Sequence, residues 1–120
     1  LITVSLNEGV VKFADLISKL GEPENVLVIY TSGERAILET HILYPAHGFG
    51  FLDYTYAPIR KSEVSAQIMP EEEVKYVWYG EPQYFYDYLT SGQLDRLSIS
   101  IIEQGIQKWN GYGQYKFVER

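Results

Sequence analysis

The sequence predicts a single α+β domain spanning residues 1–120, with an antiparallel sheet of four or five strands and helices packed on one face. A length of 120 residues suits one hydrophobic core. Strand-like segments cluster in the middle of the chain, and helical spacing occurs mainly towards its two ends. This arrangement favours an antiparallel sheet, with one N-terminal and one or two C-terminal helices, over the alternation of a parallel sheet.

The N-terminal elements follow from side-chain spacing. Residues 1–5 are rich in β-branched side chains and predict a leading strand. Residues 10–20 predict a helix, because they carry apolar side chains on one stripe. These are Val10, Phe13, Ile17 and Leu20. Gly21 is expected to cap this helix and Pro23 to prevent its continuation. Its start has two interpretations: residues 5–8 match a capping box, and the glycine directly after them equally predicts a turn.

The middle of the chain predicts a succession of strands. Residues 25–31 form a continuous apolar run, and 35–44 follow after a Ser-Gly turn. Further strands are expected at 49–56, 63–69 and 74–79. In the predicted strand over residues 35–44 we expect one face to point inward and the other outward. The inward residues are Ala36, Leu38, Ile42 and Tyr44, and the outward ones Arg35, Glu39 and His41.

The C-terminal third mixes helical and turn signals. Pro82 suits the first position of a helix that continues to Leu89 and ends at residues 91–92. Residues 97–104 suit either a second short helix or a strand. The pair Asn110-Gly111 predicts a tight hairpin, with residues 107–109 turning back into 112–118.

Composition excludes several classes of function. Ten basic and sixteen acidic residues give a net charge of −6, which disfavours binding to nucleic acid. No apolar run is long enough to be a transmembrane segment. The absence of cysteine excludes disulfides and thiolate metal sites. Because the chain begins with Leu1, we expect a processed or trimmed product whose leader, if one existed, lay upstream.

Motifs for catalysis or cofactor binding are weak. The glycines match no phosphate-binding loop, and we expect no cofactor and no metal, because the two histidines show no metal-ligand spacing. Asp53 lies in an aromatic strand, where burial would raise the pKa of its carboxyl. A small hydrolase using Asp53 with His41 or His47 is therefore a minority alternative. An enzyme is less expected than a binding protein.

Aromatic residues are the strongest compositional signal, with eleven Tyr, five Phe and two Trp. Tyrosine and tryptophan combine large rigid contact areas with a polar group, which suits binding surfaces as well as cores. We expect an exposed subset to contact a protein partner or to stack on sugar rings. The candidate binding residues are Tyr76, Trp78, Tyr79, Tyr84, Trp109 and Tyr112. For Trp109, near the chain end, a structural role in holding the C-terminal segment is favoured over a surface role.

The segment from Phe13 to Val26 reads as a helix, the tetrapeptide Leu-Gly-Glu-Pro and the start of a strand. It resembles the signature of small bacterial lipoproteins related to BamE/SmpA and of β-lactamase-inhibitor-like domains. The similarity covers residues 10 to about 56 and includes Tyr44-Pro45 before an aromatic strand. It implies an antiparallel sheet with helices on one face and a role as an envelope assembly subunit or protein binder. The lipidated cysteine of such proteins is missing, and residues 82–109 have no counterpart.

Together these features predict a noncatalytic binding or structural subunit of a bacterial cell envelope or surface assembly. Its expected partner is another protein, and its expected location is extracytoplasmic, whether periplasmic, at the cell surface or lipid-anchored through an upstream segment. The alternatives are a carbohydrate-binding module that uses exposed tyrosine and tryptophan, and the small hydrolase described above.

Overall fold

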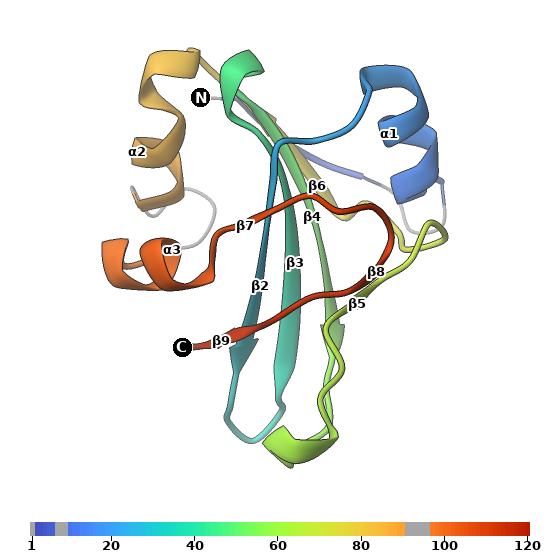
Figure 1. Cartoon of the computed structure of the whole chain (residues 1–120), viewed down its shortest axis with the longest axis vertical. Coiled ribbons are helices and arrows are strands. Elements are labelled where there is room, and N and C mark those ends of the chain that lie inside the picture. The colour runs from blue at the N-terminus through green and yellow to red at the C-terminus, as the bar shows by residue number, and fades with distance from the viewer. Residues whose placement is uncertain (1, 7–9, 91–96) are drawn as a thin grey trace.

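The computed structural model describes residues 2–6, 10–90 and 97–120, and these form a sheet with three helices (Figure 1). The strands are β1 (Ile2–Ser5), β2 (Asn25–Thr31), β3 (Ile37–Tyr44), β4 (Phe49–Tyr56), β5 (Gln67–Ile68), β6 (Tyr76–Tyr79), β7 (Gln107–Lys108), β8 (Gly113–Gln114) and β9 (Val118–Glu119). The α-helices are α1 (Phe13–Leu20), α2 (Phe85–Thr90) and α3 (Ile99–Gly105), and the short 3₁₀ turns are η1 (Pro45–His47), η2 (Lys61–Glu63) and η3 (Pro82–Tyr84). The α+β prediction is confirmed in this broad form.

The main sheet has seven strands, more than the four or five predicted. Its strand order is β1-β6-β4-β3-β2-β7, with β9 also pairing with β2. The described pairings are antiparallel apart from that of β9, which runs parallel to β2. β5 and β8 form a separate two-stranded sheet. The additional strands β7 and β9 have two residues each, too few to leave a periodic pattern in the sequence.

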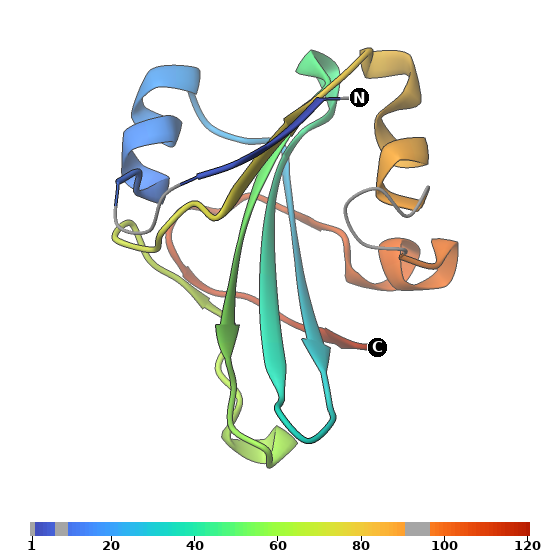
Figure 2. The ribbon, with the colours of Figure 1, turned by 180° about the vertical axis from the view of Figure 1, so that it is seen from behind.

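Helices cover both faces of the sheet, which corrects the prediction of a single covered face. Figure 1 shows α1 on one side of the strands and α2 and α3 on the other, and Figure 2 shows the same arrangement from behind. Val26 and Val28 of β2 pack in a first core with Phe13 of α1. Leu27 and Ile29 pack in a second core under α2 and α3. The continuous apolar sequence of β2 results from this burial on both sides.

Burial on both faces also changes the expected environment of His41. The side chain is completely buried, whereas the sequence predicted an outward position on β3. It shares a face of β3 with Leu43, which belongs to the second core. Its Nε2 atom lies 3.0 Å from Oε2 of Glu39, within hydrogen-bond distance.

The first helix starts later than its apolar pattern predicts. α1 begins at Phe13, and Val10 is 66% exposed outside it. The Phe13 amide donates a hydrogen bond to the Glu72 carbonyl (2.8 Å), and the Ala14 amide donates one to that of Pro70 (3.0 Å). The loop before β6 thus supplies hydrogen-bond acceptors for the first amides of α1. Because this loop is far from α1 in the sequence, the local apolar pattern does not reveal where the helix starts. The capping-box prediction over residues 5–8 falls partly outside the described residues.

In the C-terminal third, residues 99–105 are helical, and η3 begins at Pro82 as predicted. The predicted helix end at residues 91–92 lies outside the described residues. The predicted 107–118 hairpin is wrong, since β7 pairs with β2 and β8 with β5. The predicted tight turn requires positive φ at both central residues, and Gly111 has φ +85° whereas Asn110 does not have positive φ. A wider loop forms instead, closed by the Tyr115 hydroxyl, which donates to the Gly111 carbonyl (2.6 Å).

The predicted strand over 63–69 is reduced to β5. In and next to this short strand, Ala66 and Ile68 are buried and Gln67 between them is exposed. No helix within the described part of the chain is long and apolar enough to cross a membrane.

Candidate functional site

The two tryptophans among the predicted binding residues belong to the interior. Trp78 is completely buried: its ring packs against Phe85 with centroids 4.8 Å apart, and a Cβ added to Gly50 would lie 2.6 Å from it. Trp109 is only 7% exposed and packs in the first core. Both side chains are therefore core residues in this structure, and neither contributes to an exposed aromatic surface.

The four predicted tyrosines are more accessible but do not form one patch. Tyr76 is half-buried and stacks on Tyr54, with centroids 6.0 Å apart. Tyr79, Tyr84 and Tyr112 are 44%, 47% and 40% exposed. They come from β6, from η3 and from the loop between β7 and β8. Tyr79 lines a cleft together with two other aromatic rings, those of Tyr44 and Phe49.

We call this depression the aromatic cleft. It has a volume of about 460 Å³ and lies between the end of α1 and the upper ends of β3, β4 and β6. It is lined by Lys19, Leu20, Tyr44, His47, Phe49 and Tyr79. Three of these side chains are aromatic and two are basic, and they come from five different elements.

The β3–β4 connection places three of the six lining residues together. β3 ends at Tyr44, η1 carries His47, and β4 starts at Phe49 after one intervening residue, Gly48. Gly48 has φ +64°, and a Cβ there would lie 2.1 Å from the Gly80 carbonyl oxygen. Only glycine fits this position, because any side chain would collide with the backbone at the end of β6.

The chemistry of the cleft is apolar on its walls and basic at its margin. The Tyr44 hydroxyl donates a hydrogen bond of 2.7 Å to the Gly21 carbonyl, and its ring packs edge-on against Phe49 at 5.9 Å. Burial, with a smaller contribution from Tyr112, raises the pKa of Tyr44 to about 12, so its phenol stays neutral. Lys19 and His47 are exposed and form no ion pair with any residue that the structure describes. Such a cleft suits an apolar group next to a negative charge.

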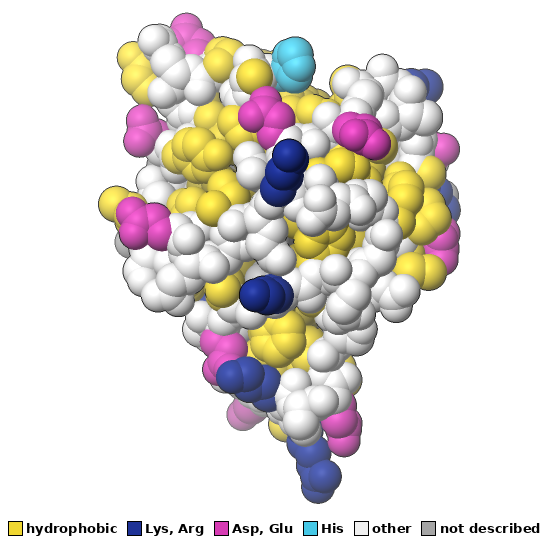
Figure 3. All heavy atoms as spheres, in the orientation of Figure 1, with side chains coloured by type: hydrophobic (Ala, Val, Ile, Leu, Met, Phe, Trp, Pro, Cys, Tyr) yellow, Lys and Arg dark blue, Asp and Glu magenta, His cyan; other side chains and the backbone are white. Residues whose placement is uncertain are grey.

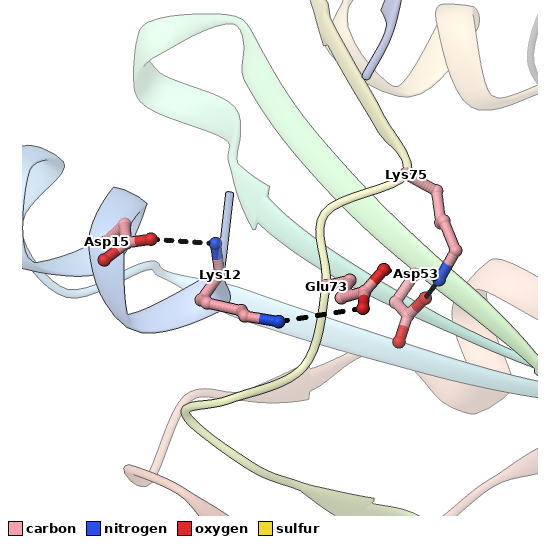
Figure 4. Close-up of polar contacts among 5 residues, drawn as sticks. All are labelled: Lys12, Asp15, Asp53, Glu73 and Lys75. Carbon is pink, nitrogen blue, oxygen red and sulfur yellow. Dashed lines mark hydrogen bonds and ion pairs between the residues drawn. The ribbon is translucent and has the colours of Figure 1, made fainter. Parts of the chain in front are cut away.

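A second depression, the acidic recess, lies on the same face of the sheet further along β4. It has a volume of about 350 Å³. It is lined by Asp53, Thr55, Met69, Glu71, Glu72, Glu73 and Lys75. Nζ of Lys75 lies 2.7 Å from Oδ1 of the buried Asp53, and Glu73 lies 3.6 Å from Lys12 (Figure 4). Asp15 accepts a hydrogen bond of 2.9 Å from the Lys12 amide, so these contacts connect the recess to the start of α1.

Carboxyl groups in the acidic recess are perturbed by burial. Burial raises the pKa of Asp53, and the hydrogen bond from Lys75 opposes that rise. Burial and then the charge of Asp53 raise the pKa of Glu72 to about 7. Oε2 of Glu72 is buried and has no hydrogen-bond partner among the described residues. The raised pKa of Asp53 agrees with the sequence-based expectation.

The structure does not bring Asp53 together with either histidine. Asp53 shares a face of β4 with Phe51 of the first core, whereas His41 lies on the face of the second core. The sheet therefore separates their side chains. His47 lies in η1, before the start of β4. Asp53 is about 13 Å along β4 from its first residue, Phe49, at about 3.3 Å per residue. No group of three or more potential ligand side chains that could hold a metal ion is found in the described part of the chain.

Comparison of the chain with protein-family models, with curated proteins and with solved structures found no match. The resemblance of Phe13–Val26 to lipoprotein-like domains therefore stays a prediction.

Sequence reasoning named two of the six residues of the aromatic cleft: Tyr79 as a binding residue, and His47 as a possible catalytic partner of Asp53. It missed Tyr44, Phe49 and Lys19 because each belongs to an element whose pattern is explained by packing alone. The one local signal was Tyr44-Pro45 before an aromatic strand, which marks the turn that places two of the rings. Without the pairing of β4 with β6, nothing in the sequence places Phe49 beside Tyr79.

Proposed function

We propose that this protein is a noncatalytic binding subunit whose partner is another protein, and that the aromatic cleft is the centre of its binding surface. The observation that carries this proposal is that the cleft continues into an exposed apolar strip. Ile2 of β1 pairs with Tyr79 of β6, so their side chains lie next to each other on one face. Ile2, Val4 and Leu20 are 50%, 41% and 46% exposed.

The surface chemistry supports a protein partner. A net charge of −6 opposes binding to a phosphate backbone. Figure 3 shows acidic, basic and hydrophobic side chains interspersed over the face in view, without a field of one sign. Contiguous exposed apolar residues rimmed by polar ones are typical of protein interaction sites.

The aromatic cleft favours binding over catalysis. Its six lining residues include no carboxylate, serine or threonine. The Tyr44 phenol is neutral, and its hydroxyl already donates a hydrogen bond to the Gly21 carbonyl. A general acid or base needs a partner that orients it, and no hydrogen bond to the His47 ring is found within the described structure.

The location in a bacterial envelope or surface assembly is part of this proposal and derives from the sequence resemblance alone. A carbohydrate-binding module is the second candidate, because the exposed ring of Tyr79 beside Phe49 offers a surface on which a sugar can stack. The two candidates differ in what the cleft residues contact.

Site-specific photo-crosslinking in the organism that makes this chain tests the proposal. A benzophenone amino acid replaces Tyr79 in the cleft, and a matched control replaces Ile59, which is 74% exposed away from the cleft. We expect one protein adduct from position 79 that is absent from position 59. Equal adducts at both positions, or none at position 79, would contradict a protein-binding cleft. Glycan binding that is lost in Tyr79→Ala would favour the carbohydrate-binding module instead.

A further inference from the structure

We infer that a groove between α2 and α3 binds a long basic side chain, arginine or lysine, of a protein. This inference goes beyond the proposed function, because the aromatic cleft lies on the α1 side of the sheet and α2 and α3 cover the opposite side (Figures 1 and 2). We call this depression the helix groove. It has a volume of about 400 Å³. It is lined by Tyr86, Asp87, Thr90, Ile99, Ile102, Glu103 and Ile106.

Three isoleucines form the apolar part of the helix groove. Ile99 and Ile102 belong to α3, and Ile106 directly follows it. Spacings of three and four residues place such side chains on the same side of a helix. Ile102 is 8% exposed and packs in the second core, whereas Ile99 is 67% exposed. The groove therefore has a buried apolar base and an apolar wall that a ligand can cover.

The charged residues that line the helix groove are both acidic. Asp87 comes from α2 and Glu103 from α3, so each helix contributes one carboxylate. Both residues are exposed, and neither forms an ion pair with any residue that the structure describes. The described lining residues include no lysine, arginine or histidine. Figure 3 shows hydrophobic side chains over α2 and α3 with acidic side chains beside them.

This combination matches the chemistry of a long basic side chain. Arginine and lysine pack their methylene groups along apolar surface and keep the charged end in contact with polar groups. In the helix groove the isoleucines can contact the methylene groups, and Asp87 and Glu103 can pair with the charged end. Tyr86, which is 42% exposed, adds an aromatic ring that attracts a cation. An acidic ligand would be repelled by both carboxylates, so charge complementarity selects a basic one.

NMR titration of the intact domain with two tripeptides tests this inference. The first is acetyl-Leu-Arg-Leu-amide, and in the second citrulline, an uncharged analogue of nearly the same shape, replaces the arginine. We expect the arginine peptide to shift the amide signals of residues 86–90 and 99–106. It should bind about threefold more tightly or better than the citrulline peptide, as expected for exposed ion pairs.

A charge-matched pair of variants shows whether the two carboxylates are responsible. Asp87→Asn combined with Glu103→Gln should reduce the affinity for the arginine peptide to that for the citrulline peptide. The control combines Glu22→Gln with Glu34→Gln, which changes the net charge equally at two exposed positions outside the helix groove. This control should bind the arginine peptide like the wild type.

Equal affinities for the two peptides, or equal losses in the two double variants, would overturn the inference. Signal shifts confined to the lining of the aromatic cleft would also overturn it, because the peptide would then occupy the other site. Hexylguanidinium is titrated in parallel: if it binds the helix groove and the arginine peptide does not, the ligand is a small organic cation and not a protein. None of these outcomes depends on the crosslink from position 79, so this inference and the proposed function can fail separately.

Discussion

At one edge of the sheet, β1 presents four uncharged, exposed residues, and at the other edge β2 is covered by two short strands from the C-terminal segment. Trp109 follows β7 into the first core, and Arg120 donates its amide to the Tyr30 carbonyl (2.9 Å) after β9. An ion pair between Lys61 and Glu119 adds a further contact at this closed edge. No comparable contact covers β1 within the described residues.

The two edges of this sheet therefore differ: one is closed by paired strands, and the other presents an uncharged strand. A paired or charged edge cannot easily receive another strand, whereas an uncharged one can. The closed edge uses residues from the end of the chain, and the open edge uses residues from its beginning. Three sites are expected to respond to substitution with decreasing effect: Trp109 at the closed edge, Gly21 between α1 and β2, and Glu72 in the loop before β6.

The largest effect is expected at the closed edge, from Trp109→Ala. The side chain is buried and contacts two rings, Tyr112 at 5.3 Å and Tyr115 at 6.2 Å between centroids. Removing a large buried aromatic side chain costs about 3–5 kcal/mol. At about 4 °C per kcal/mol, the Tm should fall by about 12 °C or more. Chemical and thermal unfolding give both values.

The control for this prediction is Tyr112→Ala, because Tyr112 is 40% exposed and contacts the same tryptophan. It should cost clearly less than Trp109→Ala. Hydrogen exchange in Trp109→Ala should rise more at Asn25 and Val26, which pair with β7, than in β6. A stability loss below about 1 kcal/mol, the range of surface substitutions, would show that Trp109 does not hold the closed edge.

A smaller effect is expected from Gly21→Val, in the turn that joins α1 to β2. Gly21 has φ +86° and ψ 177°, a conformation that is almost exclusive to glycine, and nothing lies within 4 Å of an added Cβ. The cost is therefore conformational, about 1–3 kcal/mol. Equilibrium unfolding measures it. Because the strain comes from the first side-chain atom, Gly21→Ala should lose a similar amount. Stability unchanged in both variants would mean that the turn adopts another backbone conformation.

The smallest effect is expected at Glu72, in the loop that leads to β6 beside the open edge. Burial, and then Asp53, raises the pKa of Glu72 from 4.5 to about 7. Between these values the folded protein holds a proton that the unfolded chain has released, so the free energy of unfolding falls as pH rises from 4.5 to 7. Glu72→Gln should remove this fall and stabilise the domain at pH 8 by about 1–2 kcal/mol, less than the full shift because the side chain is only partly buried.

Unfolding titrations of wild type and Glu72→Gln across pH 4–8 check this prediction. The two proteins should be equally stable at the acid end and diverge towards pH 8. Asp53, whose pKa is also raised by burial, contributes a fall of the same sign in both proteins. Parallel pH profiles would indicate that the Glu72 carboxyl is hydrated in the folded state.

Local patterns in the sequence predicted most elements correctly but not their partners. The apolar run over 25–31 predicted a strand, yet only the packing of α1 on one side and of α2 and α3 on the other made it a strand buried on both faces. The pair Asn110-Gly111 predicted a turn, but β7 and β8 paired with different strands. Hairpin signals describe local backbone preference, and the long-range pairings of β7 with β2 and of β8 with β5 overrode it.

The sequence by itself determined the α+β class, the succession of the main strands along the chain and the glycine cap after α1. These properties depend on residues close together in the chain, where periodicity and turn chemistry act. Only the tertiary structure decided that both faces are covered, that Trp78 and His41 are buried and that β1 remains an open edge beside the aromatic cleft. The cleft joins residues from Lys19 to Tyr79, and such contacts depend on which strands become neighbours, a choice made by the packing energy of the whole chain.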